Sequence, residues 1–230
     1  MEKFTSIRSS RRVETGKNKR IIHSPMDVRA VMVDFGGVLY IPPDVRALRR
    51  WQKFLGLKND GPLNEFFATP GESDYARRIF TGEIPEAEVW KKLGAHWRVS
   101  PWLLRYLRKR SFSKRRFNQP MANFIQSLRP RFQTAILSNA GDQDRQIFNE
   151  AYCIEDLVDT VIISAEVGMA KPDPRIYLLA LERLGVKPEE TIFVDDLQVN
   201  VDAARQLGIQ AIQFQKNEQV LQEITGILQT

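Results

Sequence analysis

The sequence predicts an α/β fold in which a parallel sheet is flanked by helices and carries an inserted helical cap. Three observations support this prediction. Short apolar runs alternate with helical patterns along most of the 230-residue chain, residues 42–118 interrupt the alternation, and polar side chains follow several of the apolar runs. Steady alternation of strand and helix favours parallel strands with helices on both faces. Polar ligands of such a sheet bind at the C-terminal ends of the strands.

Five β-rich apolar runs are the predicted strands, and four periodic segments between them are the predicted helices. The strands are expected at 28–33, 132–137, 160–163, 191–194 and 211–214. The helices are expected at 121–128, 142–150, 174–184 and 198–207. Gly185 ends the third of these helices, and Pro188 lies just beyond it.

Residues 42–118 contain amphipathic helical stretches and few strand signals, so they are predicted to form the cap. Residues 28–41 and 119–230 are then the α/β core. The cap is rich in aromatic side chains, which would either line a pocket or form a small helical core, and their helical spacing favours the core. These residues are Trp51, Phe54, Phe66, Phe67, Phe80, Trp90 and Trp97.

Composition points to a globular cytoplasmic protein. The hydrophobic fraction of 43% is ordinary. No apolar stretch approaches the roughly 18 residues of a membrane helix, and the N-terminus lacks the apolar core of a secretory signal, so no membrane insertion is expected. The single cysteine, Cys153, excludes an internal disulfide, which fits a reducing compartment. We expect Cys153 to be a packing residue.

The net charge of +6 is concentrated in two basic segments. Residues 1–29 hold eight Lys/Arg and three acids, and residues 105–116 hold seven bases and no acid. These segments either bind nucleic acid, a membrane surface or an acidic partner, or they are a disordered tail and a solvated helix face. The second reading is favoured because neither segment has the interleaved aromatics of a nucleic-acid reader. Residues 1–27 are therefore predicted to be a basic flexible arm, although their Arg/Ser content also resembles a transit peptide.

Polar residues that could take part in catalysis or ligand binding follow three of the predicted strands. Asp34 ends the first strand, and glycines at 36 and 37 let the backbone turn and approach a ligand closely. Ser138 and Asn139 end the second strand. Because a parallel sheet brings neighbouring strand ends together, these groups are expected to meet in one crevice.

The fourth strand and a Pro-restricted loop are expected to add four more groups to this crevice. Asp195 and Asp196 end the strand, and Asn200 follows four residues later. Lys171 precedes Pro172 at the start of a predicted helix. Clustered carboxylates repel unless a cation lies between them, and oxygen ligands favour Mg²⁺. The set suits phosphoryl transfer, in which a carboxylate attacks phosphorus while a lysine and a hydroxyl hold the other phosphate oxygens.

Four ordered motifs resemble those of the haloacid dehalogenase (HAD) hydrolase superfamily. They are Asp34-Phe-Gly-Gly-Val-Leu, Ile136-Leu-Ser138-Asn139, Gly168-Met-Ala-Lys171-Pro-Asp-Pro and Phe193-Val-Asp195-Asp196-Leu-Gln-Val-Asn200. The resemblance implies a Rossmann-like sheet with a C1-type helical cap. Within the superfamily the chain is similar to the branch of sugar-phosphate phosphatases and of the phosphatase domain of soluble epoxide hydrolases.

The resemblance also implies roles for the metal site and the nucleophile. Asp34 would be the nucleophile and a Mg²⁺ ligand, and Asp196 would be the main ligand from the fourth motif. Asp195 and Asn200 would support the metal directly or through water, or they would only hold the loop. Gly36 would offer its backbone carbonyl to the metal.

On the phosphate side, the resemblance implies that Ser138 and Asn139 bind the transferred phosphate. Lys171 would neutralise the phosphate and orient the nucleophile. The expected substrate is a small phosphorylated metabolite, and the oligomeric state is left open.

Gly36 departs from the family pattern, which usually has a second Asp acting as general acid and base at this position. A positioned acid/base contributes about 10²- to 10⁴-fold, so phosphate esters with poor leaving groups should react slowly. Three readings remain open. The chain is a Mg²⁺-dependent phosphatase that favours good leaving groups or takes its proton donor from the cap, a catalytically silent phospho-ligand or protein-binding module, or a metal-independent dehalogenase. The acidic pair at 195 and 196 disfavours the last, and the phosphatase is the preferred reading.

Overall fold

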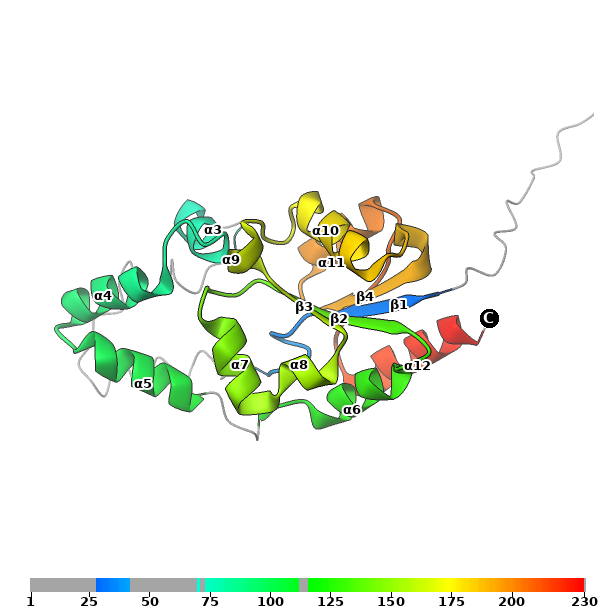
Figure 1. The fold of residues 1–230 in the computed structure, drawn as a ribbon, viewed down its shortest axis with the longest axis horizontal. Coiled ribbons are helices and arrows are strands. Elements are labelled where there is room, and N and C mark those ends of the chain that lie inside the picture. Colours follow the sequence, from blue (N-terminus) through cyan, green and yellow to red (C-terminus); the bar gives the residue numbers. More distant parts are fainter. Residues whose placement is uncertain (1–27, 42–69, 71–72, 112–115, 230) are drawn as a thin grey trace, which may run out of the picture.

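A computed structural model of the protein describes residues 28–41, 70, 73–111 and 116–229. Five strands form one parallel sheet in the order β3-β2-β1-β4-β5 (Figure 1). The strands are β1 (Ala30–Val33), β2 (Gln133–Ser138), β3 (Thr160–Ile163), β4 (Thr191–Asp195) and β5 (Gln210–Gln213). All five predicted strands are present with shifts of one or two residues at most, so the predicted α/β fold class is confirmed.

β1 lies at the centre of the sheet because its four residues, AVMV, are apolar on both faces and completely buried. Val33 pairs with Ile136 of β2 on one side and with Val194 of β4 on the other. The residues that follow these three positions are therefore neighbours at the carboxyl edge of the sheet. This register brings the first, second and fourth sequence motifs to one edge.

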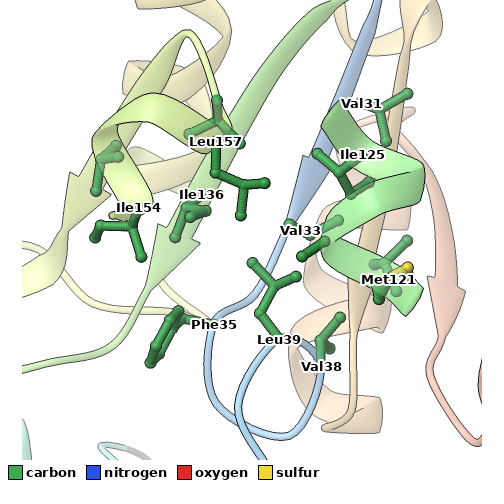
Figure 2. Packing of buried hydrophobic residues seen from close by; sticks show 14 of the residues in the cluster. Val31, Val33, Phe35, Val38, Leu39, Met121, Ile125, Ile136, Ile154 and Leu157 are labelled. Carbon is green, nitrogen blue, oxygen red and sulfur yellow. The ribbon is translucent and has the colours of Figure 1, made fainter. Parts of the chain in front are cut away.

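Helices cover both faces of the sheet (Figure 1). On one face lie α6 (Gln119–Leu128), α7 (Asp144–Tyr152), α8 (Ile154–Leu157) and α12 (Asn217–Leu228). On the other face lie α10 (Pro174–Leu184) and α11 (Gln198–Gln206). Alternate residues of β1 pack on opposite faces: Figure 2 shows Val31 and Val33 directed towards Met121 and Ile125 of α6.

Four of these helices match the predicted ones, and α8, α12 and the four-residue α9 (Ser164–Val167) were not predicted. A 3-10 helix (Pro188–Glu190) also precedes β4. The short helices at 154 and 164 are single turns, which leave little periodic signal in a sequence. The expectation for Cys153 is wrong: its side chain is exposed, and its backbone adopts a left-handed conformation (φ 52°) where α7 ends.

Three helices of the predicted cap lie between β1 and β2 in the chain. They are α3 (Asp74–Phe80), α4 (Glu86–Trp97) and α5 (Pro101–Ser111). Trp90 is buried in a small cluster of their apolar side chains, and Trp97 packs against it. These two aromatics therefore belong to a helical core, and Phe80 is half-buried. Trp51, Phe54, Phe66 and Phe67 lie outside the described residues, so the domain limits at 41/42 and 118/119 stay predictions.

The two basic segments are described only in part. Arg105 is exposed on α5, as expected for a solvated helix face, whereas residues 1–27 and 112–115 lie outside the described part of the chain. No helix among the described residues is long and apolar enough to cross a membrane.

Candidate active site

Asp34 lies at the centre of the carboxyl edge, where β1 runs into a tight turn. Its backbone N–H donates to Val194 O at 2.8 Å, which continues the ladder between β1 and β4. Its Oδ1 accepts a 2.7 Å hydrogen bond from the N–H of Phe35. Gly37 closes the turn with φ +75° and donates its N–H to Tyr40 O. The turn thus fixes the direction of the Asp34 carboxylate. Asp34 is 8% exposed.

The side chain of Phe35 anchors this turn to the core. Phe35 is buried and stacks on Phe148 of α7, with ring centroids 4.0 Å apart. Figure 2 shows it beside the loop that leaves β1, with Val38 and Leu39 on the same side of the sheet. Phe35 therefore holds the loop in place by packing in the core, while the neighbouring Asp34 contributes its carboxylate to the carboxyl edge of the sheet.

Lys171 joins the first and fourth motifs. Its Nζ lies 2.9 Å from Asp34 Oδ1 and 2.6 Å from Asp195 Oδ2, and its side chain is 0% exposed. Burial opposes the charge on Lys171, but the carboxylates of Asp195 and Asp34 outweigh this effect and raise the pKa of the ammonium. The ammonium is therefore a fixed positive charge beside Asp34.

Asp195 is completely buried, and both of its oxygens are bound within the protein. Oδ2 accepts from Lys171, and Oδ1 accepts from Asn200 Nδ2 at 3.0 Å and from the N–H of Leu197 at 2.9 Å. Asn200 is itself tied to α10, because the Tyr177 hydroxyl donates to its carbonyl at 3.0 Å. Asn200 thus contacts Asp195 directly. Tyr177 was not predicted, since in the sequence it occupies an ordinary apolar position of a helix.

Asp196 follows on the solvent side of Asp195 and is half-buried. One oxygen each of Asp34, Asp195 and Asp196 lies within 4.8 Å of the others. Burial raises the pKa of Asp34 to about 7, with Lys171 opposing the rise and Asp195 and Asp196 adding to it. Burial and the neighbouring Asp195 also raise the pKa of Asp196. Three oxygen donors whose negative charges are mutually unfavourable fit a hard divalent cation.

The two residues that were predicted to bind phosphate, Ser138 and Asn139, lie at the expected edge of the sheet. Ser138 is buried at the end of β2, two residues past the partner of Val33. Asn139 uses both side-chain groups on the backbone of Lys171: Oδ1 accepts from its N–H and Nδ2 donates to its carbonyl, each at 2.8 Å. At Gly36 an added Cβ would meet nothing within 4 Å, so this position faces open space.

A small pocket opens beside this constellation. Leu197 and Val199, which are 37% and 53% exposed, give it an apolar side, and neither was singled out from the sequence. Both lie between Asp196 and Asn200 in the chain. Only their exposure in the folded protein indicates that they line the pocket. The lining residues are Pro70, Asn139, Lys171, Pro172, Leu197, Val199 and Asn200.

Comparison with known proteins matches these motifs to a family. The family of haloacid dehalogenase-like hydrolases matches residues 28–208, from β1 to the end of α11. The chain belongs to this family. The resemblance inferred from the four motifs is therefore confirmed, as is the class of hydrolase.

Three similar proteins illustrate the range of this HAD family. Bifunctional epoxide hydrolase 2 of Sus scrofa is 31% identical over 220 residues, which cover 88% of this chain and 40% of that protein. A HAD family enzyme of Bacteroides thetaiotaomicron, solved with magnesium and inorganic phosphate, has a TM-score of 0.70 at 23% identity and covers 84% of this chain and 98% of its own. L-2-haloacid dehalogenase of Xanthobacter autotrophicus, with chloropropionic acid covalently bound, has a TM-score of 0.60 at 20% identity, with coverages of 86% and 83%. The two solved structures share the fold with this chain, and the chain spans less than half of the curated relative.

Proposed function

We propose that this HAD hydrolase is a Mg²⁺-dependent phosphatase of small phosphorylated metabolites, with Asp34 as its nucleophile. The observation that carries the proposal is the convergence of Asp34, Asp195 and Asp196 around one point with the Lys171 ammonium beside it. A fixed cation and three carboxylates at the end of a buried strand suit the charges of a phosphoryl group and a metal. The Bacteroides enzyme of the same fold was solved with magnesium and inorganic phosphate.

The chemistry follows from the positions of these side chains. An Asp34 oxygen attacks phosphorus, a new O–P bond forms, and the bond to the ester oxygen breaks. Lys171 holds Asp34 in place and offsets negative charge on the phosphoryl oxygens, while Ser138 lies at the adjacent strand end. Water then attacks the aspartyl-phosphate and releases inorganic phosphate and the Asp34 carboxylate. A bound Mg²⁺, held by Asp34, Asp196 and the carbonyl of Gly36, would supply further neutralisation of the phosphoryl charge.

Asp195 and Asn200 have a supporting role in this proposal. Both Asp195 oxygens are already bonded to Lys171, Asn200 and Leu197, so its charge chiefly holds the ammonium. Asn200 in turn fixes Asp195. Asp196 is the more accessible carboxylate of the pair and is the better placed to take a metal directly.

Gly36 sets the substrate preference that we expect. Glycine has no side chain to protonate the departing oxygen, so the leaving group takes its proton from water or from a cap residue. Acyl phosphates, aryl phosphates and sugar 1-phosphates lose less from this than ordinary alkyl phosphates. The same feature favours a second candidate function, a phospho-ligand-binding module that binds phosphate at Lys171 and turns over slowly or not at all.

The test uses acetyl phosphate and p-nitrophenyl phosphate with Mg²⁺ or with EDTA. Turnover that requires Mg²⁺ and vanishes in Asp34→Asn supports the phosphatase. Asp202→Asn is the matched control, because Asp202 is an exposed carboxylate of α11 that bonds only to its own helix neighbours among the described residues. Phosphate binding without turnover across a broad panel would favour the binding module. Halide release from 2-haloacids without metal would overturn both in favour of a dehalogenase.

A further inference from the structure

The side chain of Asn139 makes two hydrogen bonds with the main chain of Lys171. Its side-chain Oδ1 accepts from the Lys171 N–H and its Nδ2 donates to the Lys171 carbonyl, both at 2.8 Å. A planar amide that binds the N–H and the C=O of one residue together restrains both the position and the rotation of that residue. The two contacts join the end of β2 to a loop 32 residues further along the chain.

Little else among the described residues performs this task at the same place. Pro172, the next residue, has no N–H to donate. The start of α9 is tied to the chain after β2 one residue further on, where the Ser164 hydroxyl accepts from the Ala140 N–H at 3.0 Å and donates to the Ala140 carbonyl at 3.2 Å. Ser164 therefore holds the start of α9, and Asn139 holds the residue that carries the ammonium.

The ammonium needs this restraint because it must satisfy two carboxylates at once. Lys171 Nζ lies 2.9 Å from Asp34 and 2.6 Å from Asp195, with the side chain completely buried between them. A lysine side chain has four rotatable bonds, so a shift of its main chain is passed on to Nζ or absorbed by less favourable rotamers. Either outcome would loosen the contact with the nucleophile.

We infer that Asn139 is a positioning residue that holds Lys171 against Asp34, and that its side chain is not a ligand of the substrate phosphate. The inference rests on the proposed function and refines it, because the sequence motif assigns Asn139 to phosphate binding. One Nδ2 hydrogen and one Oδ1 lone pair of the amide are used on Lys171, so any phosphate contact from residue 139 comes from the second Nδ2 hydrogen or from the backbone N–H.

A double-mutant cycle separates the two roles. Asn139→Ala should lower kcat for acetyl phosphate by about 10²-fold, the loss expected when a reacting group is misplaced by an ångström or so. In a Lys171→Met background the same change should alter the residual rate by less than about threefold, because contacting residues that act through each other are not additive. A side chain that bound phosphate directly would cost the same factor in both backgrounds, which would overturn the inference.

The matched control is Asn149→Ala. Asn149 of α7 also bonds to one partner at two points, accepting from the Glu155 N–H and donating to the Glu155 carboxylate, and it lies outside the site. Its removal should leave kcat unchanged. If Asn139→Ala does not fold, Asn139→Asp keeps the acceptor and loses the donor. The deficit in kcat of Asn139→Asp relative to wild type should shrink as pH falls, because protonation of the new carboxyl restores a donor. A deficit in kcat that does not depend on pH would contradict the positioning role of Asn139.

A measurement without turnover distinguishes failure of this inference from failure of the proposed function. Amide hydrogen exchange in the metal-free wild type and Asn139→Ala reports on the contact directly, because the Lys171 N–H donates to Asn139 Oδ1. Faster exchange at the Lys171 N–H of Asn139→Ala, in a protein that hydrolyses no phosphate, would reject the phosphatase and support the positioning role of Asn139. Unchanged exchange at this N–H in an active phosphatase would reject the positioning role alone.

Discussion

At the scale of single residues, the two glycines that follow Asp34 and Phe35 have different physical requirements. An added Cβ at Gly36 meets open space, whereas one at Gly37 would lie 2.2 Å from Asp196 Oδ2 in a backbone with φ +75°. Gly37 is therefore required by the close approach of the turn to Asp196. Gly36 is not sterically required, so its identity affects the chemistry of the site and not its folding.

We predict that Gly36→Asp increases the hydrolysis of alkyl phosphates. The open space accommodates the new carboxyl, and a positioned general acid contributes about 10²-fold or more, so kcat for a simple alkyl phosphate should rise by about that factor. The rate with acetyl phosphate, whose leaving group needs no proton, should change little. Initial rates on the two substrates measure the effect. An equal change in rate on both substrates would show that the wild-type protein is not limited by a missing proton donor.

We predict opposite outcomes for alanine at the two glycines. Gly37→Ala should destabilise the protein and remove activity, because strain at positive φ costs about 1 kcal/mol or more and the methyl group displaces the Asp196 carboxylate. Gly36→Ala should leave both properties near wild type and serves as the matched control. Thermal unfolding and turnover with p-nitrophenyl phosphate report on the pair, and equal losses in both variants would contradict this account.

At the scale of secondary-structure elements, the first turn of cap helix α4 is tied to the core. Pro85 at the N-cap of α4 makes no side-chain cap, and the Glu86 N–H instead donates to Asp142 Oδ1 of the core at 3.1 Å. Close to this contact, the backbone of Gly82 lies against the Ala165 carbonyl of α9, where a Cβ would approach to 2.4 Å. Cap and core are thus in contact just beyond the second motif.

We predict that Asp142→Ala loosens the start of α4. Loss of a carboxylate acceptor at a helix N-terminus costs about 1 kcal/mol, and the change should appear as faster amide hydrogen exchange in the first turn of this helix. Asp142→Asn keeps an acceptor and loses only the charge, so it should retain most of the protection. Unchanged exchange in Asp142→Ala would mean that apolar packing alone holds the helix in place.

At the scale of the whole molecule, the sheet order concentrates negative charge in one place. β2, β1 and β4 are neighbours, so motifs separated by more than 150 residues end at the same edge. Burial, Asp195 and Asp196 together raise the pKa of Asp34 from 3.8 to about 7 in the folded chain, although Lys171 opposes the rise. Folding and metal binding are therefore linked to pH through this site.

We predict that Mg²⁺ stabilises the protein more at pH 8 than at pH 5.5. Between pH 4 and about 7 the folded state holds a proton on Asp34 that the unfolded chain has lost, so the metal-free stability falls as pH rises through this range. Above about pH 7 Asp34 is ionised and a cation offsets the repulsion from its neighbours. Melting temperatures with Mg²⁺ and with EDTA at both pH values test this. Asp34→Asn should lose most of the pH dependence, and an equal Mg²⁺ effect at both pH values would contradict the linkage.

The sequence by itself determined the strands, four of the helices that cover the sheet and the edge of the sheet at which the candidate site lies. The apolar runs of β1 to β4 are nearly continuous because most of their residues are buried, and such runs can be recognised without a structure. Asp34, Ser138, Lys171 and Asp195 were identifiable because polar residues directly after buried strands, or in a proline-restricted loop, have few structural reasons to be there. The helix at 217–228 was missed although Val220 and Ile224 show its spacing.

The tertiary structure decided which partner each polar group takes. Asn139 and Asn200 look like ligands in the sequence, yet each donates to a neighbouring residue of the site, Lys171 O and Asp195 Oδ1. Asp195 and Asp196 are adjacent and chemically identical in the sequence, but only Asp195 is completely buried against Lys171. Such assignments depend on distances of about 3 Å between segments far apart in the chain, and hydrogen bonds lose most of their strength within a further ångström. Local pattern and spacing do not contain that information.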